Sequence, residues 1–111
     1  MTEKEYAIHM IRWINKLGLP DIEPAKRAFF MAKSFWKEGN TENFEAIKNE
    51  LWLWVDNNGG PRITSERDMV IVRMIMCVAS EDVTEVRDMG FFEDLLVSLG
   101  FSYDEAYEGT E

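Results

Sequence analysis

Apolar residues recur at helical spacing through several long segments of this chain, and this periodicity constrains the fold more than any other feature. The first such segment, residues 3–17, carries a stripe along one helical face. The stripe consists of Tyr6, Met10, Trp13, Ile14 and Leu17. Similar stripes run through residues 22–38 and 42–56, and Gly and Pro lie at the joints between segments. The pattern predicts an all-α fold, a compact single-domain bundle of about five or six helices that spans residues 1–111.

Local signals predict where the helices begin and end. Thr2 and Glu5 have the spacing of a capping box, and Gly18 and Gly39 are natural stops for the first two helices. The expected N-caps of the next three helices are Asp21, then Asn40 or Thr41, then Thr64 or Ser65. Two shorter helices are expected near residues 82–89 and 91–99, with Gly90 between them.

Residues 69–79 are almost continuously apolar, with Arg73 as the only charge. Such a run fits either a buried helix or a buried strand, because Val and Ile are frequent in it. Its length and the acidic residues just before it, Glu66 and Asp68, favour a helix near the centre of the bundle.

Charge is distributed very unevenly along the chain. Residues 1–79 hold 11 acidic and 11 basic side chains, whereas residues 80–111 hold ten acidic side chains and one basic one, Arg87. The whole net charge of −9 therefore lies in the last third of the sequence. A field of this sign repels nucleic acid and anionic membranes and attracts cationic proteins.

Several classes of function lack the residues that they need. His9 is the only histidine and Cys77 the only cysteine, so neither a zinc site nor a disulfide is expected. There is no glycine-rich phosphate loop, and no apolar run is long enough to span a membrane. The N-terminus lacks the layout of a secretory signal. We expect a cytoplasmic protein that is not an enzyme and uses no cofactor.

The acidic third and an aromatic neighbour are the expected partner-binding surface. Trp52 and Leu53 turn away from the apolar stripe of their helix, so they are either exposed anchors for a partner or part of a helix buried on all sides. Aromatic residues beside charges suit an interface that steers a partner and excludes water. The expected binding residues are Glu81, Asp82, Glu85, Asp88, Glu93, Asp94, Tyr103, Asp104, Glu105, Tyr107 and Trp52.

Two alternative functions follow from the carboxylates. Glu42 and Glu45 share a helical face, as do Glu85 and Asp88, and two such pairs on facing helices would hold Mg²⁺ in an all-α nucleotide pyrophosphohydrolase. The other alternative is a nucleic-acid mimic, whose carboxylates would imitate backbone phosphates and inhibit a DNA-binding protein.

The overall profile resembles the small immunity proteins of bacterial contact-dependent growth-inhibition and polymorphic toxin systems. The segments that carry this likeness are residues 27–36 (RAFFMAKSFW), 50–56 (ELWLWVD) and 90–96 (GFFEDLL). The resemblance implies a cytoplasmic antidote that binds one cognate toxin domain, often a basic nuclease, and covers its active site. It carries over no residue by position, so the expected binding residues depend on charge and helical geometry alone.

Overall fold

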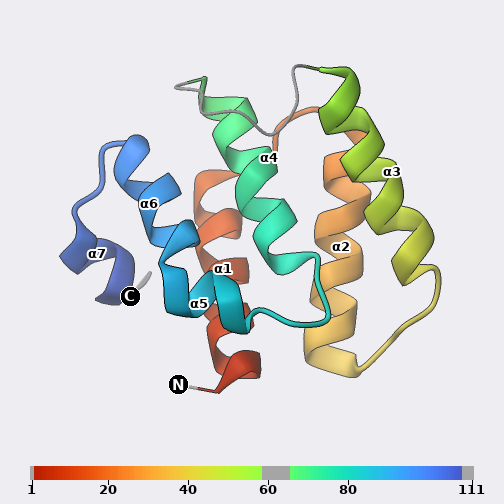
Figure 1. The fold of residues 1–111 in the computed structure, drawn as a ribbon, viewed down its shortest axis with the longest axis horizontal. Coiled ribbons are helices and arrows are strands. Elements are labelled where there is room, and N and C mark those ends of the chain that lie inside the picture. Colours follow the sequence, from red (N-terminus) through yellow and green to blue (C-terminus); the bar gives the residue numbers. More distant parts are fainter. Residues whose placement is uncertain (1, 59–65, 109–111) are drawn as a thin grey trace.

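The computed structural model describes residues 2–58 and 66–108, in which the regular structure is entirely helical (Figure 1). Seven helices follow one another in this part of the chain. They are α1 (Glu3–Leu17), α2 (Glu23–Glu38), α3 (Phe44–Asn57), α4 (Arg67–Val78), α5 (Thr84–Met89), α6 (Phe91–Ser98) and α7 (Tyr103–Glu108). The all-α prediction is confirmed, and α7 adds one helix to the six segments expected from the sequence.

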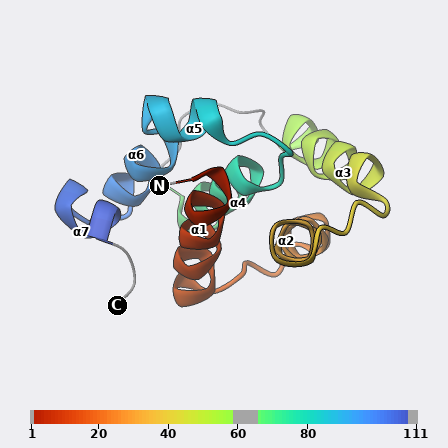
Figure 2. The ribbon, with the colours of Figure 1, turned by 90° about the horizontal axis from the view of Figure 1, so that it is seen from below.

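Helix α4 lies at the centre of the arrangement. It packs against α1, α2 and α6 and less extensively against α3. Figure 2 shows α1 and α2 on one side of α4, with α3 and α5 on the other. The apolar run 69–79 forms most of α4 and its C-cap, Ala79, so it is a helix and not a strand. Six side chains of α4 are buried: Val70, Ile71, Val72, Met74, Ile75 and Val78.

The expected cap of α1 is confirmed, but that of α2 is wrong. The Thr2 hydroxyl accepts from the Glu5 amide at 3.1 Å, and the Glu5 carboxylate accepts from the Thr2 amide at 2.9 Å. For α2 the N-cap is Ile22, and the Asp21 carboxylate instead pairs with Lys26 Nζ at 2.8 Å. An N-cap at Asp21 would place Pro24 at N3, where proline has no N–H to donate to the capping side chain.

Helix α3 begins later than the sequence predicts. Its N-cap is Asn43, in the left-handed conformation with φ 58°, so Asn40 and Thr41 are not the cap. They form the preceding turn, in which Asn40 Oδ1 accepts from the Glu42 amide at 2.9 Å. Because this turn satisfies local donors, it replaces the first helical turn that the periodicity suggested. The expected caps at Thr64 and Ser65 lie outside the described residues.

Helix α7 was missed, although a local signal for it exists. Ser102 Oγ accepts from the Glu105 amide at 3.1 Å, and the Glu105 carboxylate accepts from the Ser102 amide at 3.0 Å, which is a capping box. The preceding Phe101 ring stacks edge-on against Trp13 of α1, with centroids 4.9 Å apart, and Ala106 is buried. These contacts hold the C-terminal helix against the rest of the bundle.

Candidate partner-binding surface

A groove of about 910 Å³ runs between α3 on one side and the α5–α6 pair on the other, with α4 as its floor. Four of the expected binding residues meet along it: Trp52, Asp82, Glu85 and Asp94. The other residues that line it are Lys48, Arg73, Met76, Cys77, Ala79, Ser80, Val86, Phe91 and Leu95. The structure thus brings the exposed tryptophan and part of the acidic third to one surface.

The floor of the groove is a half-buried face of α4 that lies between α3 and the α5–α6 pair. Arg73, Met76 and Cys77 are separated by three and four positions, so they share one side of the helix and are half-buried. Burial raises the pKa of the Cys77 thiol to about 12, with a smaller contribution from the charge of Glu93. The thiol is therefore neutral at physiological pH and contributes to an apolar floor.

Exposed apolar side chains lie on both walls. On α3, Trp52 follows Lys48 by one helical turn, and the Trp52 side chain is 41% exposed. Its neighbour Leu53 is 62% exposed, so helix α3 is not buried on all sides. On the opposite wall, Phe91 at the start of α6 is 43% exposed. Large apolar groups that remain in water next to a groove are characteristic of protein-binding sites.

The wall formed by α5 and α6 is acidic. Asp82 precedes α5 and accepts from the Thr84 amide at 2.9 Å, and this hydrogen bond lowers the pKa of Asp82. Glu85 is exposed on α5. Asp94 of α6 accepts from the Tyr103 hydroxyl at 2.7 Å, so these two expected binding residues lie in direct contact. The three carboxylates make this wall negative.

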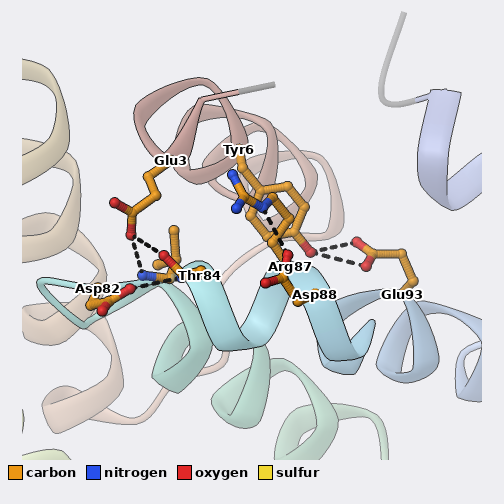
Figure 3. Close-up of polar contacts among 8 residues, drawn as sticks. Glu3, Tyr6, Asp82, Thr84, Arg87, Asp88 and Glu93 are labelled. Atoms are coloured by element: carbon orange, nitrogen blue, oxygen red, sulfur yellow. Dashed lines mark hydrogen bonds and ion pairs between the residues drawn. The ribbon is translucent and has the colours of Figure 1, made fainter.

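Glu3 fixes the position of the acidic wall, and the sequence did not point to it. Its Oε1 accepts from the Val83 amide at 3.0 Å and from the Thr84 hydroxyl at 2.9 Å (Figure 3). Glu3 therefore ties the start of α5 to α1 from 80 positions away, through the backbone N–H of the N-cap residue Val83 and the Thr84 hydroxyl. No local pattern marks Glu3 for this contact, because its partners lie 80 and 81 positions away.

Glu93 was expected on the binding surface, and this expectation is wrong. Its side chain is 0% exposed, and the Tyr6 hydroxyl of α1 donates to its carboxylate at 2.7 and 3.0 Å (Figure 3). Burial raises the pKa of Glu93, and the Tyr6 hydrogen bond partly opposes this rise. Glu93 falls on the inward face of α6 beside Phe92, where its carboxylate finds a donor that the sequence alone does not reveal.

The remaining expected binding residues are exposed but lie outside the lining of the groove. They are Glu81, Asp88, Tyr103, Asp104, Glu105 and Tyr107. Asp88 contacts Arg87 with an N–O distance of 3.3 Å, and Glu105 caps α7. Tyr107 lies close to Gly90, between α5 and α6: its hydroxyl is 3.6 Å from where a Cβ of that glycine would be. These residues extend the negative surface away from the groove.

The carboxylate pairs considered for a magnesium site do not converge. Glu42 precedes α3 and Glu45 lies in its first turn, whereas Glu85 and Asp88 lie on α5. Among residues 2–58 and 66–108, no group of three or more His, Cys, Asp or Glu side chains is placed to hold a metal ion. The geometry that a nucleotide pyrophosphohydrolase would require is therefore not met by these four residues.

Comparisons with known proteins identify no relatives of this chain. No protein-family model matches the sequence, no curated protein is detectably similar to it, and no solved structure matches the fold. Among the described residues, no helix has the length and apolar character that crossing a bilayer requires.

Proposed function

We propose that this chain is an inhibitor of the immunity-protein type, which binds a cationic toxin domain and covers its active site. The observation that carries the proposal is the groove over α4, in which exposed Trp52 and Phe91 stand beside the carboxylates Asp82, Glu85 and Asp94. It combines the two requirements of a tight inhibitor, namely apolar anchors and a charge opposite to that of the target.

The carboxylates and the apolar anchors of the groove have different roles in binding. The negative surface raises the association rate, because charge complementarity brings typical rate constants of roughly 10⁵–10⁶ M⁻¹s⁻¹ toward 10⁸–10⁹ M⁻¹s⁻¹ at low salt. The apolar anchors slow dissociation, and truncation of such an anchor costs about 2 kcal/mol or more. Trp52 is the natural anchor, because it is the most exposed tryptophan and sits at the edge of the groove.

Occlusion is the mechanism that fits a nuclease target. A nuclease binds phosphate groups with basic side chains, and carboxylates held on a folded surface can occupy the same positions. The exposed carboxylates of α5 and the preceding residue Glu81 are suitable for this role, because Glu3 holds the start of α5 in place. The buried Glu93 has no part in it.

Charge reversal tests the proposal against a matched control. The test variant carries Glu81→Lys, Glu85→Lys and Asp88→Lys, which leaves the structural residues Glu3 and Asp82 in place. The product of the adjacent gene is co-expressed with the tagged chain, and its affinity is measured by surface plasmon resonance at several salt concentrations. We expect the triple variant to bind at least about a hundredfold more weakly, mainly through slower association.

The control variant carries Glu42→Lys, Glu45→Lys and Asp56→Lys, which makes the same change in net charge at exposed positions on and just before α3. We expect it to bind nearly as well as the wild type. Equal weakening by both variants would show that only net charge matters and would contradict the proposed surface. Capture of a DNA-binding protein, in a complex that high salt dissolves, would favour the nucleic-acid mimic instead.

A further inference from the structure

We infer that the groove over α4 receives an amphipathic helix of the partner, oriented by a charge difference between its two walls. The inference rests on the proposed function, since it names the part of the partner that the same surface recognises. The two walls differ in sign: Lys48 and Arg73 lie on the side of α3 and the floor, and Asp82, Glu85 and Asp94 lie on the side of α5 and α6.

The dimensions of the groove suit a helix. The part of α4 that lines the groove runs from Arg73 to its C-cap Ala79, which is about 10 Å along the helix axis. A helix with its side chains is about 10–12 Å across, so about two turns of a partner helix would lie over this stretch of α4. Packing of this kind would bury the half-exposed floor of the groove.

The lining of the groove is mainly apolar. Met76, Cys77, Val86 and Leu95 lie between the exposed rings of Trp52 and Phe91. Methionine adapts its shape to different partners, and the neutral Cys77 thiol behaves as a small apolar group. The occupant should therefore present an apolar stripe at positions i, i+3 or i+4, and i+7.

Arg73 supplies a second and independent observation. Its Nε is buried without a hydrogen-bond partner, and no ion pair of Arg73 is found among residues 2–58 and 66–108. The Arg73 side chain as a whole is half-buried and lines the groove, so an acceptor that enters the groove can pair with its otherwise unneutralised charge. Because a guanidinium pairs best with a carboxylate, the partner helix should carry an acidic side chain on the flank facing Arg73 and Lys48.

The opposite flank of the partner helix should be basic. Asp82, Glu85 and Asp94 form the wall that this flank would face, and opposite charges across an interface fix its orientation. A second copy of this chain is a poor occupant, because two molecules with a net charge of −9 each repel one another. The predicted occupant is thus a helix with an apolar stripe, one acidic flank and one basic flank.

Three synthetic peptides test this arrangement directly. All carry the same leucine stripe over 15 residues. One peptide has lysines on one flank and glutamates on the other, the second has lysines on both flanks, and the third has glutamates on both. Fluorescence anisotropy gives their affinities, and amide chemical shifts locate the binding site. We expect the mixed peptide to bind at least about tenfold more tightly than either of the others, with shifts in α3–α6 and in the Trp52 indole.

The Arg73→Met variant isolates the role of the guanidinium, because methionine keeps the apolar stem. We expect it to abolish the preference for the mixed peptide over the lysine peptide. Arg12→Met is the matched control, since Arg12 is exposed on α1 and does not line the groove. If Arg73→Met fails to fold, Lys48→Gln serves in its place, and the expected result is a smaller loss of the same preference.

The outcomes separate this inference from the proposed function. Equal binding of the mixed and lysine peptides, or shifts outside the groove, would overturn the inference and leave inhibition of a basic toxin standing. Selective binding of the mixed peptide in the groove, together with failure of the toxin complex, would refute the proposed function and keep the groove as a helix-binding site. A dimer in sedimentation equilibrium that Trp52→Ala dissociates would assign the groove to a second copy and also overturn the inference.

Discussion

Removal of the Tyr6 hydroxyl tests how strongly the buried contact between α1 and α6 stabilises the fold. In Tyr6→Phe the ring remains, but Glu93 loses the donor that lies 2.7 and 3.0 Å from its two carboxylate oxygens. Removing the partner of a buried hydrogen-bonding group costs about 1–3 kcal/mol, so we expect the free energy of unfolding to fall by about 2 kcal/mol. For 111 residues, an unfolding entropy of roughly 2.1 cal/mol/K per residue makes this a drop in Tm of about 9 °C.

Tyr103→Phe is the matched control, because it removes the same kind of hydroxyl-to-carboxylate contact at an exposed site. The Tyr103 hydroxyl donates to Asp94 at 2.7 Å, yet both residues remain in contact with water. Water replaces the lost hydrogen bond there, so the melting temperature should stay nearly unchanged. Calorimetry and urea unfolding of both variants provide the comparison. If the two variants lost the same stability, the argument that burial makes the Tyr6 contact important would be refuted.

The same contact predicts a pH dependence. Burial raises the pKa of Glu93 in the folded state above its unfolded value, so at a pH between these two values the folded protein holds a proton that the unfolded chain has released. The contribution of Glu93 to stability is therefore most favourable below the unfolded pKa and declines as the pH rises through the folded pKa.

The Glu93→Gln variant has no carboxyl group to titrate at this position. Its stability relative to the wild type should therefore increase as the pH rises from the unfolded to the folded pKa of Glu93. The loss in Tyr6→Phe should become larger as the pH rises through the folded pKa of Glu93, because the Tyr6 hydrogen bond favours the ionised carboxylate. If the stability of each variant relative to the wild type did not change with pH, Glu93 would not be the titrating group.

Three further predictions concern other parts of the fold. Glu3→Ala should destabilise the protein by about 1 kcal/mol and speed amide exchange in α5, whereas Glu23→Ala, in the first turn of α2, should not affect α5. Phe92→Ala should cost about 3–5 kcal/mol in urea unfolding because Phe92 is fully buried, and Phe91→Ala, at the exposed groove wall, less than about 0.5 kcal/mol. Because its pKa is raised to about 12, Cys77 should react with a thiol reagent at pH 8 at least about a hundredfold more slowly than a cysteine in a short peptide.

Local signals in the sequence were sufficient for most of the helices. The capping box of Thr2 and Glu5 and the stop at Gly39 appear in the structure as expected, because they depend on neighbouring residues only. The boundary errors also have local causes. Pro24 lacks the N–H that a cap at Asp21 would need. Ser102 and Glu105 have the same capping-box spacing as Thr2 and Glu5, and this spacing marks the start of α7.

The binding surface was only partly predictable. Trp52, Glu85 and Asp94 were chosen from charge and helical spacing, and they do reach the surface of one groove. Arg73 was expected only as the one charge within a buried helix, because periodicity does not reveal that this side chain lines a groove between other helices. Glu93 was expected on the acidic surface because it belongs to the acidic third, but the Tyr6 hydroxyl that partners its buried carboxylate lies elsewhere in the chain.

The sequence by itself determined that the chain is helical and that its negative charge lies in the last third, because helical period and charge are properties of neighbouring residues. Only the tertiary structure decided which carboxylates reach water and which residues share the groove. Glu93 is buried because Tyr6, 87 positions away, supplies its hydrogen bond, and Trp52 faces the acidic wall because Glu3 positions α5 from the opposite end of the chain. Such contacts depend on how the helices pack, and no local pattern encodes them.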